Sequence, residues 1–403
     1  MIGTRLIRLL TILLCLPLIA ARGHGLRYTQ GHSSLCIPFD AANRHIAFQG
    51  SINGRDGMRI VLDTGAGGSV IDAVRAEELG LEKQGQAHAL GSGGSEQGSI
   101  VNGVDVQLPG VRIVDQRMST LALGSLAAQS GRPLDGILGQ PVFAQSVVEV
   151  DYTKQCVSLF EPSSYTYKGS GMSVPLSFID NTPYVDARVE LPDGRSLKGK
   201  FVIDTGASTS LVLAPEFVEK EAVLASLGKT MATQSRGVGG SSDIRLARVA
   251  KLELGGFTLA QPVAALHPQG VGRISADGTA GNIGGGVLSR FKVIFDYPKR
   301  RMILEPGPDI DLPFETDMSG LALVAVAPDF KRINVSRVLE GSPAVEAGIQ
   351  VGDEIETVNG KPASEVGLIA LREQLRRDGQ DVQLTLKRGD ERVTLGLKTR
   401  RMI

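Results

Sequence analysis

The sequence predicts a mainly β protein in which one structural unit occurs twice, followed by a small α+β domain. Three observations predict this fold class: a seven-residue segment near position 60 recurs near position 201, the apolar segments are short and β-branched, and 50 of the 403 residues are glycine. Short apolar segments bounded by Gly, Pro or Asp are typical of strands joined by tight turns. The length by itself predicts two to four domains.

The duplication is indicated by five segment pairs that keep their order and nearly their spacing along the chain. Residues 60–66 read Ile-Val-Leu-Asp-Thr-Gly-Ala, and residues 201–207 read Phe-Val-Ile-Asp-Thr-Gly-Ala. The other pairs, all at offsets of 145 or 146, are 91–95 with 237–241, 108–111 with 254–257, 136–139 with 281–284, and 150–152 with 295–297. Residues 36–161 and 172–305 are therefore two copies of one unit, and we expect a pseudo-twofold axis to relate them.

Each copy of Asp-Thr-Gly follows an apolar segment, which places a carboxylate in a turn at the end of a predicted strand. If the axis brings Asp63 and Asp204 together, the two carboxylates cannot both ionise in partly dry surroundings, and they share one proton. The ionised member can then take a proton from a water molecule that attacks a carbonyl carbon, while the protonated member donates to the carbonyl oxygen. The pattern indicates general acid/base hydrolysis without a covalent intermediate.

The residues that follow each aspartate predict how the two turns are fixed. Thr64 and Thr205 can hydrogen-bond across the axis, and Gly65 and Gly206 leave backbone N–H groups free to approach the carboxylates. A single Asp-Thr-Gly is most often a turn capped by its own aspartate. Its duplication inside a repeat favours the catalytic interpretation.

These motifs resemble those of the retropepsin-like aspartic proteases, in a single-chain form with two lobes, here residues 24–161 and 162–306. The resemblance implies that Asp63 and Asp204 are the catalytic pair and that two glycine-rich segments are flaps that close over an extended peptide. The flap residues are Gly91, Ser92, Gly93 and Gly94 in the first copy, and Gly237, Val238, Gly239 and Gly240 in the second. Two features depart from the family pattern: Asn282 stands where an apolar residue is expected, and neither flap carries an aromatic residue.

The residue after each Asp-Thr-Gly bears on the pH of the reaction. Pepsin-like enzymes usually carry a hydroxyl residue there, which donates to the carboxylate, whereas this chain has Ala66 and Ala207. Fewer donors to the charged form raise the pKa of a carboxyl. We therefore expect activity to peak at mildly acidic pH.

The N-terminal residues 1–23 read as a secretory signal peptide, cleaved near residues 20–25. Arg5 and Arg8 precede an apolar run over residues 9–21, which is shorter than the roughly 20 residues that span a bilayer. We therefore expect a secreted or periplasmic protein that contacts a membrane only if this segment stays uncleaved. In an oxidising compartment, Cys36 and Cys156 are either one disulfide or two buried thiols.

The C-terminal region, residues 319–403, follows a polar, proline-containing linker at 307–318 and resembles a PDZ domain of bacterial type. The resemblance rests on residues 335–360, which end in an Asn-Gly turn, and on a predicted helix from about 365 to 377. A PDZ domain captures an extended chain end by adding it to a sheet edge. The resemblance implies a carboxylate-binding loop at Gly320, Leu321, Ala322 and Leu323; the alternative is a module that only packs on the protease.

Composition narrows the remaining function classes. Lys and Arg number 43, as do Asp and Glu, so no net charge attracts nucleic acid. The five histidines show no metal-ligand spacing, and we expect neither a metal nor another cofactor. The sequence therefore predicts an exported aspartic endopeptidase whose partners are protein or peptide substrates, with a PDZ domain that recruits or gates them. The alternative is a non-catalytic peptide-binding or scaffold protein that retains the fold.

Overall fold

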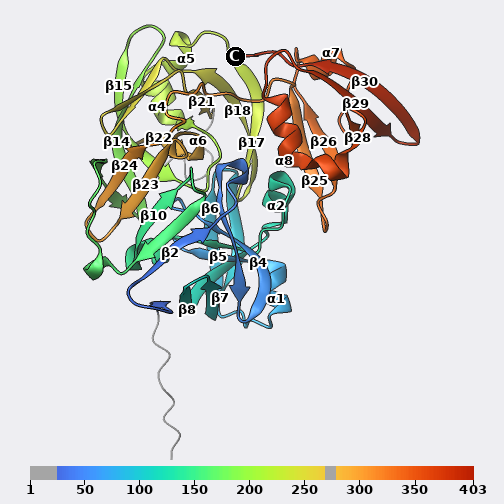
Figure 1. Ribbon diagram of the computed structural model, residues 1–403. Coiled ribbons are helices and arrows are strands. Elements are labelled where there is room, and N and C mark those ends of the chain that lie inside the picture. Colours follow the sequence, from blue (N-terminus) through green and yellow to red (C-terminus); the bar gives the residue numbers. More distant parts are fainter. Residues whose placement is uncertain (1–24, 268–277) are drawn as a thin grey trace, which may run out of the picture.

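The computed structural model describes residues 25–267 and 278–403, which form two β lobes and a smaller C-terminal domain beside them (Figure 1). The predicted mainly β class is confirmed, because strands make up most of the regular structure of both lobes. The predicted signal peptide lies outside the described residues. Within the described part of the chain, we find no helix with the length and apolar character needed to cross a membrane.

Lobe 1 is built on an eight-stranded sheet in the order β1-β8-β5-β9-β4-β3-β7-β6. Its strands are β1 (Gly25–Tyr28), β3 (Ile46–Ile52), β4 (Arg55–Leu62), β5 (Ser69–Asp72), β6 (Gln86–Gly91), β7 (Gly94–Leu108), β8 (Val111–Leu121) and β9 (Gly136–Leu138). The helices of this half are η1 (Ala42–Arg44), α1 (Ala73–Glu78), α2 (Gly124–Ser130), α3 (Gln140–Gln145) and η2 (Pro162–Ser164).

Lobe 2 repeats this path, with the order β17-β18-β21-β16-β22-β15-β14-β19-β20 and with β13 paired to β14. Its strands are β13 (Ser177–Ile179), β14 (Thr182–Glu190), β15 (Ser196–Asp204), β16 (Leu211–Leu213), β17 (Met231–Gly237), β18 (Gly240–Arg248), β19 (Lys251–Leu254), β20 (Phe257–Ala260), β21 (Val263–Leu266) and β22 (Thr279–Gly284). Its helices are α4 (Pro215–Lys220), α5 (Val223–Ser226) and α6 (Gly285–Leu288). The central order β8-β5-β9-β4-β3 matches β21-β16-β22-β15-β14, as the repeat predicts.

A six-stranded sheet joins the two lobes, in the order β12-β24-β23-β10-β11-β2. Its strands are β2 (Ser33–Pro38), β10 (Val147–Asp151), β11 (Cys156–Phe160), β12 (Met172–Pro175), β23 (Phe291–Asp296) and β24 (Arg301–Pro306). The halves meet where β10 pairs with β23, and one hydrophobic core runs through both lobes. A disulfide between Cys36 and Cys156 links β2 to β11, which decides between the two states that the sequence left open.

The C-terminal domain has its own sheet and its own hydrophobic core. Its elements are β25 (Leu321–Val326), β26 (Arg332–Val338), α7 (Pro343–Glu346), β27 (Glu354–Val358), β28 (Lys361–Pro362), α8 (Ala363–Leu375), β29 (Asp381–Arg388) and β30 (Glu391–Lys398). The predicted turn at Asn359 and Gly360 joins β27 to β28, and both residues have positive φ as this tight turn requires. The predicted helix is α8, shifted by two residues toward the N-terminus.

The segment that connects this domain to lobe 2 is fixed in place. The guanidinium group of Arg290 donates to the backbone carbonyls of Asp309, Ile310, Leu312 and Pro313. It also lies 3.5 Å from the ring centroid of Phe314, whose side chain is buried in the protease core. The linker predicted at 307–318 is therefore not a free tether.

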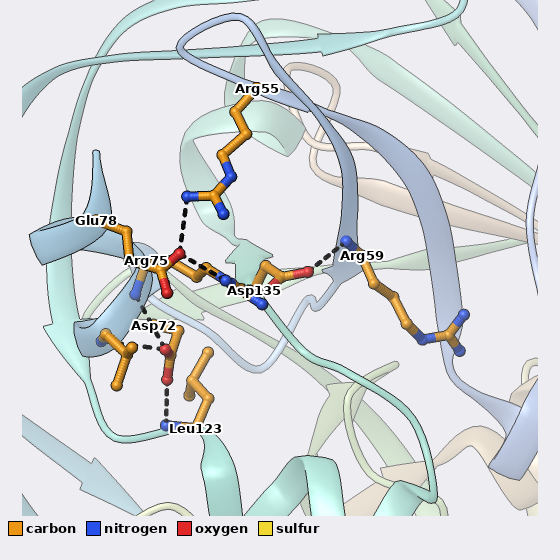
Figure 2. A network of polar contacts seen from close by, with 8 residues as sticks. Arg55, Arg59, Asp72, Arg75, Glu78, Leu123 and Asp135 are labelled. Atoms are coloured by element: carbon orange, nitrogen blue, oxygen red, sulfur yellow. Dashed lines mark hydrogen bonds and ion pairs between the residues drawn. The ribbon is translucent and has the colours of Figure 1, made fainter. Parts of the chain in front are cut away.

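A polar network in lobe 1 joins β4, α1 and the segments that lead into β9 and α2 (Figure 2). Asp135, which directly precedes β9, accepts hydrogen bonds from Arg59 N on β4 and from the Arg75 side chain on α1. Asp72 caps α1 and also accepts from the backbone N–H of Leu123. The network thus holds β4 and β9 together at the start of their parallel pairing, and the turn follows at the other end of that pairing.

Candidate functional site

Asp63 and Asp204 lie in equivalent turns, each at or just after the end of a strand. β4 runs parallel to β9, and β15 runs parallel to β22, with Leu62 opposite Leu138 and Asp204 opposite Gly284. The backbone N–H of Asp63 donates to the Leu138 carbonyl at 2.9 Å, which extends the ladder to the first residue of the turn. The chain must then leave the strand, and the Asp-Thr-Gly sequence makes that turn.

The two turns are joined by reciprocal threonine hydrogen bonds. Thr64 Oγ1 accepts from Thr205 N and donates to the Ile203 carbonyl, while Thr205 Oγ1 accepts from Thr64 N and donates to the Leu62 carbonyl. The four distances are 3.0, 2.7, 3.0 and 3.0 Å, and both threonines are fully buried. The predicted contact across the axis is therefore present in both directions.

The glycines of the turns pack against the carboxyl group of the opposite lobe. A Cβ on Gly65 would lie 2.7 Å from the Asp204 carboxyl, and a Cβ on Gly206 would lie 2.4 Å from the Asp63 carboxyl. A methyl group does not fit at either distance. These glycines are therefore required by the close approach of the two turns.

The two carboxyl groups lie close enough to interact directly. Burial raises the pKa of Asp63 well above its usual range, and the negative charge of Asp204 raises it further. The backbone N–H of Gly65 donates to Asp63 Oδ1 at 2.7 Å, and those of Gly206 and Ala207 donate to Asp204 Oδ1 at 2.9 and 3.0 Å. The two carboxyl groups thus lie together, and a proton shared between them stays a prediction.

Three further residues face the carboxyl pair, and sequence reasoning did not assign them to it. Asn282 Nδ2 donates to Asp204 Oδ2 at 2.5 Å. His45 interacts electrostatically with Asp204 and hydrogen-bonds to the backbone of Gly206, and burial lowers its pKa. Burial raises the pKa of Tyr297 well above its usual range, and the charges of both aspartates add to this shift. The sequence did flag Asn282 as a departure from an apolar pattern, which was the available signal.

The glycine-rich segments form two hairpins whose tips meet. β6 and β7 turn at Gly91 to Gly94, and β17 and β18 turn at Gly237 to Gly240. The backbone N–H of Gly93 donates to the Val238 carbonyl at 3.0 Å. A Cβ on Gly239 would lie 2.3 Å from the backbone of Gly94, so side chains are excluded where the hairpins touch.

The second hairpin also contacts the Asp-Thr-Gly turn of the first lobe. Val238 packs in a small hydrophobic cluster with Ala66, which follows that turn, and with Ile137 of β9. Ser92, at the matching place in the first hairpin, is polar. The tip of the second hairpin is therefore positioned next to the carboxyl pair, which is consistent with a flap.

The predicted carboxylate-binding loop of the C-terminal domain uses its first N–H groups internally. The backbone N–H groups of Ser319 and Gly320 donate to Asp317 Oδ1 at 3.0 and 2.6 Å, and that of Leu321 donates to Ser319 Oγ at 3.1 Å. Asp317 has a pKa raised to about 6, mainly by burial. Ala322 pairs with Arg337 of β26 in the domain's own sheet. Peptide binding by this loop stays a prediction.

The groove beside the loop faces lobe 1. β25 is an edge strand, and α2 of lobe 1 packs against it (Figure 1). Arg372 of α8 donates at 2.7 Å to the Leu323 carbonyl on β25 and at 2.7 Å to the Gln129 carbonyl on α2. A Cβ on Gly131, just after α2, would lie 3.0 Å from the Leu368 side chain of α8. A segment of the same chain thus covers the edge to which a peptide would add.

No group of three or more His, Cys, Asp or Glu residues in the described ranges is arranged to hold a metal ion. The carboxyl pair itself offers two neighbouring acidic side chains, and Asp204 also accepts a hydrogen bond from an amide. This arrangement suits proton transfer to and from a substrate.

Comparison with protein families gives two matches. A family model described as aspartyl protease matches residues 48–142 and again 185–285, so that each lobe is matched separately. A model described as PDZ domain matches residues 311–387. No curated protein matches the chain.

Proposed function

We propose that this chain, whose two lobes belong to the retropepsin-like aspartyl proteases and whose C-terminal region is a PDZ domain, is an exported endopeptidase. The observation that carries the proposal is the close approach of Asp63 and Asp204 in two intact Asp-Thr-Gly turns that are joined by their threonines. Two buried carboxyls that interact directly are expected to hold one proton between them, which would supply an acid and a base in the same site.

The reaction needs only these two side chains and a water molecule. The ionised carboxylate takes a proton from the water as its oxygen bonds to the carbonyl carbon, and the protonated carboxyl donates to the carbonyl oxygen. When the tetrahedral intermediate collapses, the C–N bond breaks, the leaving nitrogen takes up the proton that the base removed from water, and the other carboxylate regains its proton from a hydroxyl of the intermediate. One water is consumed, and the products are a carboxylic acid and an amine.

An extended peptide is the substrate shape that the two hairpins favour. Their tips contact each other through the backbone at Gly93 and Val238, so a substrate must part them to reach the carboxyl pair. Once parted, the tips expose backbone groups from both lobes. Such groups recognise an extended main chain with little regard to its side chains.

The test is the hydrolysis of a peptide library and of a denatured protein by wild type, Asp63→Asn and Asp204→Asn. We expect both variants to lose activity by about 10³-fold or more, because each removes one of the two proton-transfer groups. Asp56→Asn, an exposed change on β4, is the matched control and should retain full activity. A wild type that binds peptides but cleaves none, or a fully active Asn variant at either site, would support the non-catalytic scaffold instead.

The PDZ domain is proposed to gate the cleft. Its β25 edge is covered by α2, and its Arg337 forms an ion pair at 3.6 Å with Asp243 on β18, a strand of the second flap. A small cavity of about 100 Å³ separates β25 from β17 of the same flap and is lined by Gln234 and Arg236. A chain end that adds to β25 would displace α2. This displacement would occur next to β17, which leads to the tip of the second flap. This position supports gating more directly than recruitment by a free tether.

Arg372→Ala in the full chain distinguishes gating from recruitment, with Arg392→Ala, an exposed ion-pair residue on β30, as the control. Gating predicts a severalfold faster cleavage of a short peptide, because the contact between α2 and the PDZ domain is weakened. Recruitment predicts unchanged cleavage of the peptide and a loss on whole proteins. A truncation that removes the PDZ domain should end after residue 316, because Phe314 belongs to the protease core.

Export is supported by the apolar N-terminal segment and by the disulfide, since disulfides persist in oxidising compartments. Cell fractionation together with N-terminal sequencing of the mature protein tests this part of the proposal. A mature protein that begins at Met1 in a reducing compartment would contradict it.

A further inference from the structure

The two strands that flank the carboxyl pair carry different side chains at equivalent places. Ile137 on β9 lies opposite Val61 of β4, and Asn282 on β22 lies opposite Val202 of β15. These two positions correspond in the repeat. At these corresponding positions lobe 1 carries an aliphatic side chain and lobe 2 carries an amide.

The amide of Asn282 contacts one carboxyl group only. Its Nδ2 lies 2.5 Å from Asp204 Oδ2, while Asp204 Oδ1 accepts from the backbone N–H groups of Gly206 and Ala207. Both oxygens of Asp204 are thus hydrogen-bonded by protein donors. Asp63 receives backbone hydrogen bonds from Gly65 and Gly206, and the N–H of Ala66 is directed to the main-chain carbonyl of Asp63 at 3.4 Å.

The cost of placing this amide argues against a purely structural role. Asn282 Oδ1 is buried and has no hydrogen-bond partner among the residues that the structure describes. A buried polar atom without a partner destabilises a fold by about 1–3 kcal/mol. An apolar residue, as at Ile137, would avoid that penalty, so the benefit of Asn282 must lie in what its Nδ2 does.

The other charged or titratable groups around the pair do not replace this donor. His45, just before β3, faces Asp204, but burial disfavours its charged form. Tyr297, just after β23, faces both aspartates and has no hydrogen-bond partner for its hydroxyl in the described part of the chain. Asn282 is therefore the side-chain donor that breaks the symmetry of the pair.

We infer that Asn282 is a positioning residue that makes Asp204 the ionised general base and leaves the shared proton on Asp63, the general acid. The inference rests on the proposed peptidase function. A hydrogen-bond donor favours the charged form of the carboxylate that it contacts. Asp204 therefore accepts the proton of the attacking water, and Asp63 protonates the substrate carbonyl.

The test is the pH profile of kcat/KM for Asn282→Ile, which gives lobe 2 the residue of lobe 1. Without the amide donor the ionised carboxylate is less favoured, so the acidic limb should move upward by roughly one pH unit. The swapped variant Ile137→Asn with Asn282→Ile carries one donor on the other side, and its acidic limb should return toward that of wild type. Asp56→Asn, the exposed change on β4, is the control, and it should leave the acidic limb in place.

The outcomes separate this inference from the proposed function. If wild type cleaves peptides in a manner that needs both aspartates, but Asn282→Ile has the wild-type acidic limb, the inference fails and the peptidase function stands. If wild type cleaves nothing, the proposed function fails. NMR titration of 13C-labelled aspartates can still measure which of the two carboxyl groups loses its proton first. There, Asp63 losing its proton before Asp204 would overturn the assignment.

Discussion

The two lobes hold the same turn on the same backbone frame but support it with different side chains. In lobe 1 the N–H of Asp72 donates to the Asp135 carbonyl at 2.9 Å, and in lobe 2 the N–H of Ala214 donates to the Ala280 carbonyl at 2.9 Å. Asp135 is buried within the polar network of Figure 2, whereas Ala280 is buried in the hydrophobic core. The repeat therefore determines the backbone hydrogen bonds of the two lobes, while the side chains around the turns differ.

The glycines of the two Asp-Thr-Gly turns test a feature that the lobes share. Gly65→Ala and Gly206→Ala should each lower kcat by about 100-fold or more, because either methyl group would displace the opposite carboxyl group. Gly68→Ala is the matched control, since its added Cβ meets no atom within 4 Å. Steady-state kinetics measures the effect. A large loss in one lobe with none in the other would break the functional equivalence of the two turns.

The polar network around Asp135 tests a feature in which the two lobes differ. Asp135→Ala gives lobe 1 the residue that lobe 2 has and should destabilise the protein by about 2–4 kcal/mol, because Arg59 N and the Arg75 guanidinium lose a buried acceptor. Urea denaturation measures this change. The reciprocal Ala280→Asp should also destabilise the protein, because its carboxylate would be buried without a partner. A neutral result for Asp135→Ala would show that the network is dispensable.

The threonine contacts test the axis itself. Thr64→Val and Thr205→Val should each lower the free energy of unfolding by about 1–3 kcal/mol, since each leaves a buried N–H and a buried carbonyl of the other lobe unpaired. Thr→Ser at the same positions keeps the hydroxyl and should restore most of the stability. Because each hydroxyl bonds only main-chain groups, the two variants remove different hydrogen bonds, and the double variant should lose about the sum of the two single losses.

The pH optimum tests how far burial and the mutual charge of the two aspartates, which act on the pair as a whole, set the pH range of activity. In the proposed mechanism the pair is active with one proton, and activity falls when Asp63 ionises. Because the pKa of Asp63 is raised by burial and by Asp204, that fall comes at higher pH than for a free aspartate. We expect a pH–rate maximum at mildly acidic pH. A maximum below about pH 3 would contradict this expectation.

Much of the site could be predicted from the sequence because the repeat presents each of its motifs twice. Two copies of Asp-Thr-Gly with two glycine-rich segments in the same order predicted the carboxyl pair, the threonine contacts and the hairpins. The PDZ helix and its Asn-Gly turn were predicted because local pattern and turn chemistry specify them. Local pattern alone does not specify the break between α4 and α5, where Ala222 adopts a left-handed conformation.

The sequence by itself determined the duplication, the aspartate pair and the order of the domains, because those depend on motifs and spacing within short segments. The tertiary structure decided what meets across long separations. Asn282 reaches Asp204, Arg372 joins α8 to α2, Arg290 fixes the linker, and Cys36 pairs with Cys156. Each of these contacts depends on the distance and direction between elements that are not neighbours in the chain, and no local pattern carries that information.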